Sequence, residues 1–268
     1  MSSRVIDFHT HIFPDKVAAE AIPKMESSSG HQTFTDGTVK GLVASMDAGG
    51  IEKSIALPVA TNPEKVSSIN RFGASIGEPR LCMFGAIHPK AQSWREHLEE
   101  ILGYGMPGVK LHPDYQNFYP DDPEVLPVFA AFRDSGLLVF FHAGEDLSFQ
   151  PPNRGGPARI AALLETLPGL KVLAAHMGGF QMWDEVETHL VGKPVYMDTS
   201  FSIGYMSDER IRTMIRRHGE DYILFGTDSP WMDQSEEVKN VLGLGLGSAA
   251  EEKIFFANAL RLIPESAG

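Results

Sequence analysis

The chain alternates short apolar runs with longer amphipathic segments along almost its whole length. The short runs are rich in Val, Ile, Leu and Phe without polar alternation, which predicts strands that are covered on both faces. The first begins at Val5, and the others lie at residues 54–58, 81–87, 108–111, 137–141, 171–175, 195–197 and 222–225. The segments between them predict helices at residues 39–48, 64–76, 93–102, 123–135, 158–166, 183–190, 208–217, 235–242 and 249–260.

This alternation predicts an α/β fold, specifically a (β/α)₈ TIM barrel that forms a single domain over residues 1–268. The competing architecture is a doubly wound open sheet. Such sheets usually carry a Gly-rich phosphate-binding turn after the first strand, and here that place holds His9-Thr10-His11. The length and the 43% hydrophobic content suffice for one large core.

Charge and cysteine content narrow the function class. The formal net charge is −12 and the sequence pI is about 5.3, so the surface repels phosphate backbones and argues against a nucleic-acid partner. The single cysteine, Cys82, cannot form an internal disulfide, which suits a reducing compartment. No stretch resembles a signal peptide or a membrane span, so we expect a cytoplasmic protein without a membrane partner.

Two histidines separated by one residue end the first predicted strand. Alternate side chains of a strand point to the same face, so His9 and His11 project together, with Asp7 behind them. Two converging imidazoles are suited to bind a divalent metal. Taken alone, the pair is explained equally well as polar residues at a strand end.

Other polar side chains follow the later strands in the same way. In a barrel the carboxyl ends of the strands form one face, where active sites are built. Six of the ten histidines fall at such ends, which favours the metal site over chance placement. They are His9 and His11 of the first strand, and His88, His112, His142 and His176 after later strands. Two aspartates, Asp198 and Asp228, follow the last two strands.

The motifs resemble those of the amidohydrolase superfamily of metal-dependent barrels. The resemblance is carried by Asp-x-His-x-His on the first strand, His on the fifth and sixth strands and Asp on the eighth. The phrases GVKLHPDYQ, FFHAGED, AAHMGG, DTS and FGTDSPW, and the closing helix at residues 252–262, resemble the amidohydrolase-related branch that includes aminocarboxymuconate-semialdehyde decarboxylase. The resemblance covers essentially the whole chain and is weak for the substrate.

This resemblance implies the metal ligands and the catalytic residues. The ligands would be His9, His11, His142 and Asp228. Asp228 would also shuttle a proton, and His176 would orient or polarise the metal-bound water or bind a second ion. Zinc is the expected metal; manganese, iron and nickel stay open, as does the choice between one ion and two.

Two further residues have roles that the sequence leaves open. Lys110 lies on the fourth strand, where this superfamily holds a carboxylate or a carbamylated lysine that bridges two metals. It would otherwise neutralise a substrate carboxylate or pair with a nearby acid. His112 either lines the pocket, as a ligand of a second metal or of substrate, or hydrogen-bonds a loop.

The loops beyond the strands would determine the substrate. We expect two loops over the mouth of the barrel, at residues 13–38 and 145–156. Arg154 in the second loop would clamp a carboxylate, although a surface arginine is the simpler interpretation. Tyr115 and Trp231 would wall an apolar or aromatic pocket, and packing at the rim explains them almost as well.

These features predict a metal-dependent hydrolase, with metal-bound hydroxide attacking the amide, ester or lactone carbonyl of a small organic acid. The alternative is a metal-dependent non-oxidative decarboxylase or hydratase on the same barrel. A phosphate-acting nuclease barrel fits the acidic surface poorly, and a non-catalytic ligand-binding barrel would be expected to have lost ligands. The partner would be a small-molecule carboxylate. Relatives of this branch are often dimers, so the resemblance also implies a homodimer.

Overall fold

A computed structural model describes residues 4–263. The chain divides into two compact units, which we describe separately. The first unit contains residues 4–56, 78–82 and 198–263, and the second contains residues 57–77 and 83–197. The prediction that residues 1–268 form one domain stays a prediction. Among the described residues, no helix is both long enough and apolar enough to cross a membrane.

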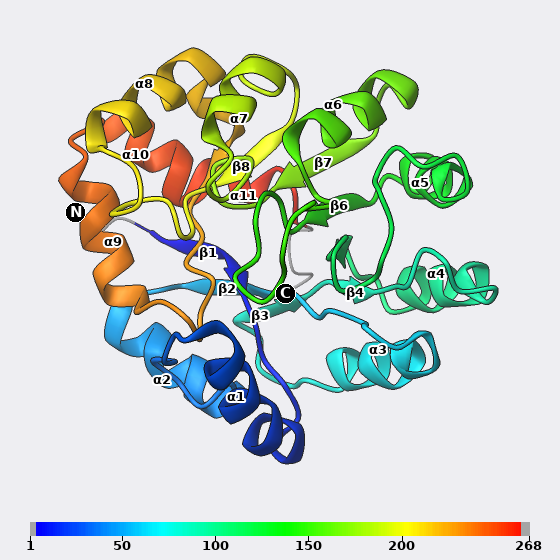
Figure 1. Ribbon diagram of the computed structural model, residues 1–268. Helices are drawn as coiled ribbons and strands as arrows, with labels where there is room; N and C mark the ends of the chain where they lie inside the picture. The colour runs from blue at the N-terminus through cyan, green and yellow to red at the C-terminus, as the bar shows by residue number, and fades with distance from the viewer. Residues whose placement is uncertain (1–3, 264–268) are drawn as a thin grey trace. The chain divides into compact units, whose positions relative to one another are not determined.

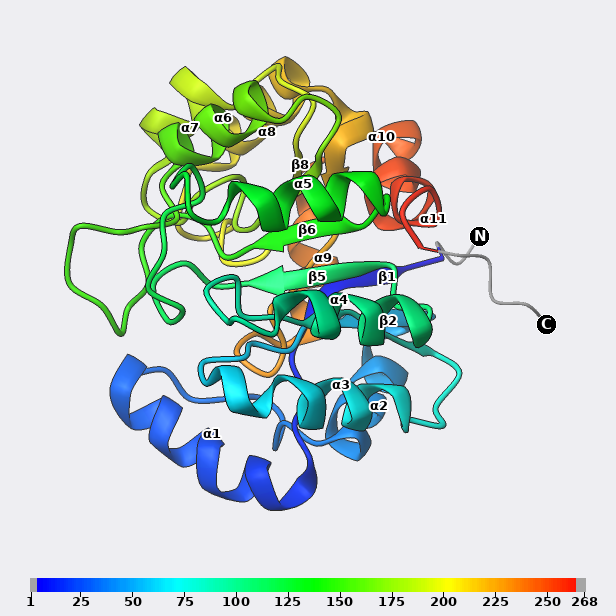
Figure 2. The ribbon, with the colours of Figure 1, turned by 90° about the vertical axis from the view of Figure 1, so that its right-hand side faces the viewer.

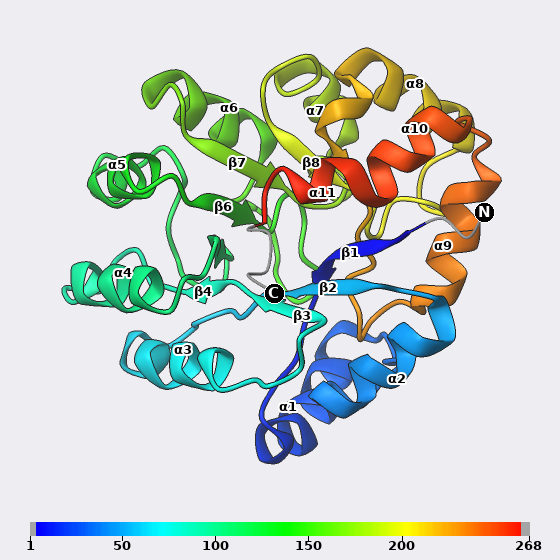
Figure 3. The ribbon, with the colours of Figure 1, turned by 180° about the vertical axis from the view of Figure 1, so that it is seen from behind.

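The first unit is built around β1, which is buried at all five positions. β1 pairs in parallel with β2, with Ile6 opposite Lys53 and Asp7 opposite Ser54, and Figure 3 shows the two strands next to each other. The next strand of this sheet is β3. On the other edge of β1, the amide of Phe8 donates to the carbonyl of Phe225, which directly follows β9. The strands are β1 (Ile6–Thr10), β2 (Lys53–Ala56), β3 (Leu81–Met83) and β9 (Ile223–Leu224).

Some helices of the first unit begin at side chains that cap them. Thr38 accepts a hydrogen bond from an amide in the first turn of α2, and Asp233 does the same for α9. A π-helical segment, Lys253–Ala257, links the last two helices and packs against β9. The helices are α1 (Asp15–Ser29), α2 (Val39–Gly49), α8 (Asp208–His218), α9 (Gln234–Gly243), α10 (Ser248–Glu252) and α11 (Asn258–Leu260), with a 3₁₀ turn at Glu220–Tyr222.

The second unit contains parallel strands side by side in chain order. Every residue of β5 and β6 is buried, as the unbroken apolar pattern predicts, and Figure 2 shows these two strands next to each other. The strands are β4 (Gly85–Ala86), β5 (Gly108–Leu111), β6 (Leu138–Phe141), β7 (Lys171–Ala174) and β8 (Tyr196–Asp198). The last residue of β8, Asp198, belongs to the first unit.

The helices of the second unit all lie on one side of its strands, as Figure 1 shows. Each connects one strand to the next parallel strand, which is the repeating β–α unit that the sequence predicts. They are α3 (Val66–Ala74), preceded by a 3₁₀ turn at Pro63–Lys65, α4 (Trp94–Gly103), α5 (Leu126–Asp134), α6 (Pro157–Thr166) and α7 (Trp183–His189).

The predicted elements are found in the predicted order, with two differences. The strand expected at residues 81–87 is two short strands, β3 and β4, separated at Phe84. The prediction of a loop at residues 13–38 was wrong in part, because this segment contains the 15-residue helix α1. Only Ala18 and Ile22 of α1 are buried, and Pro23 lies inside the helix, where a proline usually indicates a helix boundary.

Helix α9 brings an acidic side chain into the core of the first unit. The Glu237 side chain is only 1% exposed, and Asn240 donates a hydrogen bond of 2.8 Å to its Oε1. Burial raises the pKa of this carboxyl from 4.5 to about 7, and the negative charge of Asp7 adds to the shift. Above its folded-state pKa the carboxyl is therefore a buried charge that opposes folding.

We predict that Glu237→Gln stabilises the protein at pH 8. The folded state binds this proton more tightly than the unfolded state, so the wild type loses stability as the pH rises from 4.5 to about 7. The variant should gain about 1–3 kcal/mol in free energy of unfolding at pH 8 and much less at pH 5, measured by urea denaturation. Glu20→Gln, at an exposed position of α1, should give no gain. An equal gain at both pH values would contradict the prediction.

Candidate functional site

Three of the predicted ligands lie together in the first unit. The Nε2 atoms of His9 and His11 are 3.2 Å apart. Asp228 Oδ1 is 3.2 Å from His9 Nε2 and 2.9 Å from His11 Nε2. His9 and Asp228 are buried and His11 is partly buried. The structure therefore gathers two imidazole nitrogens and one carboxylate oxygen from opposite ends of the chain.

Backbone hydrogen bonds explain this convergence. The segment after β9 runs alongside the end of β1: the Asp228 amide donates to the carbonyl of His9 at 2.7 Å, and the His11 amide donates to the carbonyl of Ser229 at 2.6 Å. Asp228 has a φ of 63°, a left-handed conformation that is uncommon for a residue other than glycine. Backbone strain of this kind persists where surrounding contacts determine it, and it is frequent at functional sites.

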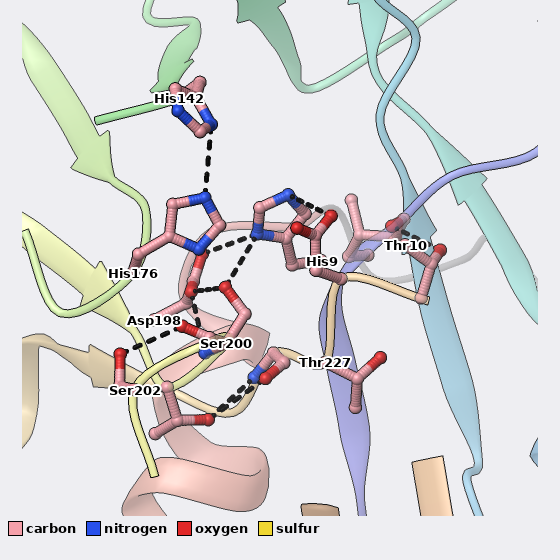
Figure 4. A network of polar contacts seen from close by, with 12 residues as sticks. His9, Thr10, His142, His176, Asp198, Ser200, Ser202 and Thr227 are labelled. Carbon is pink, nitrogen blue, oxygen red and sulfur yellow. Dashed lines mark hydrogen bonds and ion pairs between the residues drawn. The ribbon is translucent and has the colours of Figure 1, made fainter. Parts of the chain in front are cut away.

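The ring of His9 is oriented by a carboxylate (Figure 4). His9 Nδ1 lies 2.9 Å from Asp198 Oδ2 and 3.2 Å from Ser200 Oγ. Asp198 in turn accepts hydrogen bonds from the amide and the hydroxyl of Ser200. Because Nδ1 donates to a carboxylate, the lone pair lies on Nε2, which is the atom that faces His11 and Asp228. Metal-bound histidines usually show this carboxylate partner.

Asp7 lies behind this group and is bound by other residues. It accepts hydrogen bonds from the hydroxyl of Thr227 at 2.6 Å, from Gln234 Nε2 at 2.7 Å and from the amide of His9 at 3.1 Å. Burial raises the pKa of Asp7 to about 7, even though these hydrogen bonds lower it. Asp7 therefore supports the backbone of the site and takes no part in the group of three.

Two predicted residues lie together in the second unit. His142 directly follows β6, and His176 follows β7, the neighbouring strand. His142 Nδ1 and His176 Nε2 are 3.2 Å apart, and the two rings face each other in Figure 4. His176 has a φ of 60°, and its carbonyl accepts a hydrogen bond of 3.1 Å from the indole of Trp183. Adjacent parallel strands thus place the two rings side by side.

His112 is the third histidine of this second group. Its ring stacks on that of His142, with centroids 4.1 Å apart and planes 6° apart, and the ring of Tyr115 packs edge-on against it at 4.5 Å. His112 Nε2 is 3.0 Å from Asp146 Oδ2. Burial raises the pKa of Asp146, but the hydrogen bond from His112 and the charges of the two imidazoles outweigh burial and hold the pKa below its ordinary value.

The remaining predicted residues have contacts of their own. Lys110 is buried, with its Nζ 4.1 Å from the centre of the Phe140 ring. Arg154 is held by Asp114, which accepts a hydrogen bond of 2.9 Å from its amide and lies 3.5 Å from its guanidinium. The amide of Trp231 donates to the carbonyl of Asp228 and closes the turn after the ligand. Their predicted roles with metal or substrate stay predictions.

The first group fits a transition metal by its donor set and by its distances. Ligands of a tetrahedral zinc lie about 3.3–3.6 Å from one another, given metal–ligand distances of about 2.0–2.2 Å. The three distances between His9, His11 and Asp228 are 3.2, 3.2 and 2.9 Å, slightly below this range. Nitrogen and carboxylate donors suit zinc and also manganese or iron, so the group does not select one metal.

Sequence reasoning missed two residues near these groups. Asp146 ends the phrase FFHAGED, which we used only for resemblance, and lies in a predicted loop; its partner His112 is 34 positions away in the sequence. Ser200 follows Asp198 in the phrase DTS, which we used only for resemblance. Both residues had a signal in the sequence. Asp146 is an acid close to the strand end that carries His142, and Ser200 is a hydroxyl residue close to the strand end that carries Asp198.

The family model described as Amidohydrolase matches residues 6–264. This match covers nearly the whole chain, so the chain belongs to that family, as its motifs indicated. A search of curated proteins finds no significant match.

Solved structures with similar folds confirm the (β/α)₈ TIM barrel. An uncharacterised TIM-barrel protein from Bordetella bronchiseptica is 19% identical with a TM-score of 0.77, covering 97% of this chain and 98% of the other. A 5-carboxyvanillate decarboxylase from Novosphingobium aromaticivorans, complexed with manganese and a nitrobenzoic acid, is 14% identical with a TM-score of 0.71, covering 97% and 96%. A putative 2-pyrone-4,6-dicarboxylic acid hydrolase from Pseudomonas putida is 16% identical with a TM-score of 0.68, covering 98% and 98%.

We predict that Asp198→Ala weakens metal binding without removing a ligand. The ring of His9 would lose the acceptor of its Nδ1 hydrogen, and such losses typically reduce metal affinity by about 10–100-fold. Competition with a chromophoric chelator measures the affinity of the purified protein for zinc. Asp208→Ala, an exposed aspartate in the first turn of α8, is the matched control and should bind like the wild type. Unchanged affinity in a folded Asp198→Ala protein would refute the role.

Proposed function

We propose that the chain is a metal-dependent hydrolase that acts on the carbonyl group of a small organic acid. The observation that carries the proposal is the convergence of His9 Nε2, His11 Nε2 and Asp228 Oδ1 within 3.2 Å of one another. His142 is the fourth ligand in this proposal, as the family pattern predicts. Zinc is the metal we propose first, and manganese is the second choice because a similar decarboxylase is complexed with it.

The residues of the chain divide the chemical work. A divalent metal in such a site acts as a Lewis acid and lowers the pKa of bound water toward about 7. Asp228 would ligate through Oδ1, the oxygen next to the two imidazoles, and its second carboxylate oxygen can accept a proton and return it to a leaving group. His176 would polarise the water or the substrate carbonyl, with its backbone held by Trp183. Asp198 keeps His9 in the ligating tautomer.

The second candidate is a non-oxidative decarboxylase. A specific observation supports it: a decarboxylase of an aromatic carboxylate is among the similar folds. A putative hydrolase of a dicarboxylic acid is among them too. Both relatives are named for carboxylate compounds, which supports a small carboxylate as substrate. Lys110 and Arg154 are the cations we propose for its recognition, with Tyr115 and Trp231 along the pocket. A cytoplasmic location and a homodimer belong to the same proposal.

We predict that His11→Ala and Asp228→Asn each lower metal content and abolish turnover while the barrel still folds. Each change removes one of three donors that face one another. Elemental analysis gives the metal content, and circular dichroism checks the fold. His189→Ala, a partly buried histidine at the end of α7, serves as control and should keep both metal and activity. Wild-type metal content in both ligand variants would refute the assignment.

The assay for turnover should separate the two candidates. Hydrolysis of a lactone or an ester of a small organic acid releases a proton at neutral pH, and hydrolysis of an amide releases an amine, whereas decarboxylation of an aromatic carboxylate releases carbon dioxide and consumes a proton. Proton or amine release by the wild type that is lost in His11→Ala supports the hydrolase. Carbon dioxide release by the wild type that is lost in His11→Ala supports the decarboxylase and contradicts the hydrolase.

Substitution of Lys110 tests how many metals the protein binds. If the wild type contains two equivalents with a carbamylated lysine between them, Lys110→Ala and Lys110→Arg should both contain one, because an arginine cannot form the bridge. If Lys110 instead binds a substrate carboxylate as an ammonium, Lys110→Arg should keep the wild-type metal content and much of the substrate affinity, and Lys110→Ala should raise KM. Two equivalents in both variants would exclude a bridging lysine.

A further inference from the structure

His142 belongs to the proposed metal site, but His112 and Asp146, which cluster with it, have no role in the chemistry proposed so far. The carboxylate of Asp146 lies 3.0 Å from His112 Nε2 and 4.0 Å from His142 Nε2. The side chains of the three residues are 8, 14 and 13% exposed, in that order, so water screens their interactions only weakly. Side chains clustered in this way with a predicted metal ligand either form a binding site of their own or fix the orientation of that ligating side chain.

The two nitrogens of the His142 ring face different kinds of partner. Nε2 lies 3.2 Å from the carbonyl oxygen of Glu145 and on the same side as Asp146. Both are acceptors, so Nε2 carries the hydrogen. Nδ1 lies 3.2 Å from His176 Nε2 and carries the lone pair. The ring is thus arranged to ligate through Nδ1, with the opposite nitrogen hydrogen-bonded to the backbone, as is usual for metal-bound histidines.

His112 determines the plane of that ring. The two imidazoles are almost parallel, with planes 6° apart and centroids 4.1 Å apart, while Tyr115 packs edge-on against His112. His112 is held in turn by its hydrogen bond to Asp146. Asp146 directly follows Glu145, whose carbonyl receives the His142 hydrogen, and Asp146 Oδ1 accepts a hydrogen bond of 2.7 Å from the amide of Ser148. One acid therefore contacts the stacking partner of His142 and also holds the turn that follows its acceptor.

We propose that Asp146, acting through His112 and the Glu145 carbonyl, is a positioning residue that fixes the ring plane and the tautomer of His142. This inference rests on the proposed function, in which His142 is a metal ligand. A separate metal site made of the same three side chains is less favoured, because His142 Nε2 already faces the Glu145 carbonyl at 3.2 Å and stands 4.0 Å from the carboxylate.

The tautomer can be measured without any metal. In metal-free protein labelled with ¹⁵N-histidine, the ring nitrogen shifts report which nitrogen carries the hydrogen, and His142→Ala identifies the signal of His142. We expect the Nε2-protonated form in the wild type and a mixture of tautomers in Asp146→Ala. Asp146→Asn keeps an oxygen that accepts from His112, so it should restore the wild-type form. Asp134→Asn, an exposed aspartate of the same unit, is the control.

Metal affinity is the second measurement. Zinc titration against a chromophoric chelator should show about 10–100-fold weaker binding in Asp146→Ala and in His112→Ala, with an unchanged number of sites. His112→Phe keeps a ring for stacking and loses the hydrogen bond, so it should shift the tautomer while preserving more affinity than His112→Ala. Asp146→Asn should bind nearly as tightly as the wild type.

The outcomes separate this inference from the proposed function. If the wild type binds no metal, the proposed function is overturned, and so is the part of the inference in which His142 ligates the metal. Normal wild-type binding with an unchanged tautomer and unchanged affinity in Asp146→Ala overturns the inference alone. So does the loss of one whole equivalent of metal in that variant, which would assign the three side chains to a metal site of their own. Full affinity in His142→Ala removes His142 from the ligands of the proposed function and overturns the inference with it.

Discussion

The pairing of β1 with the segment after β9 is the constraint on which the candidate site depends. Two backbone hydrogen bonds, from Asp228 to His9 and from His11 to Ser229, bring residues more than 200 positions apart into register. Because these bonds fix the backbone, the three donor atoms need only ordinary side-chain conformations to meet. The left-handed backbone of Asp228 is the local cost of this arrangement.

Each unit uses a carboxylate to control a histidine. In the first unit Asp198 accepts from Nδ1 of His9 and leaves Nε2 for ligation. In the second unit Asp146 holds His112, which lies flat on His142. An imidazole has two nitrogens and can ligate through either, so its chemistry depends on which one carries the hydrogen. The second partner of a histidine is therefore as informative as its place at a strand end.

Membership of the amidohydrolase family accounts for the donor set but leaves the reaction open. Similar folds include a decarboxylase and a hydrolase, and their likeness to this chain extends to the fold alone. The same ligands can serve both reactions, because each needs a Lewis acid and a proton carrier. The segments beyond the strand ends differ more freely than the strands. Arg154 belongs to such a segment and is paired with Asp114 in this structure.

The sequence by itself determined the order of strands and helices, the fold class and the residues that follow each strand. These are local properties: apolar runs and helical spacing report burial, and His9 and His11 share a face because a strand alternates. The sequence did not reveal helix α1, which contains Pro23, a residue that usually indicates a helix boundary. Tertiary structure alone decided which nitrogen of each histidine faces a partner and that Asp146 contacts His112. Such contacts join residues that are distant along the chain, and no local pattern encodes the direction of a ring.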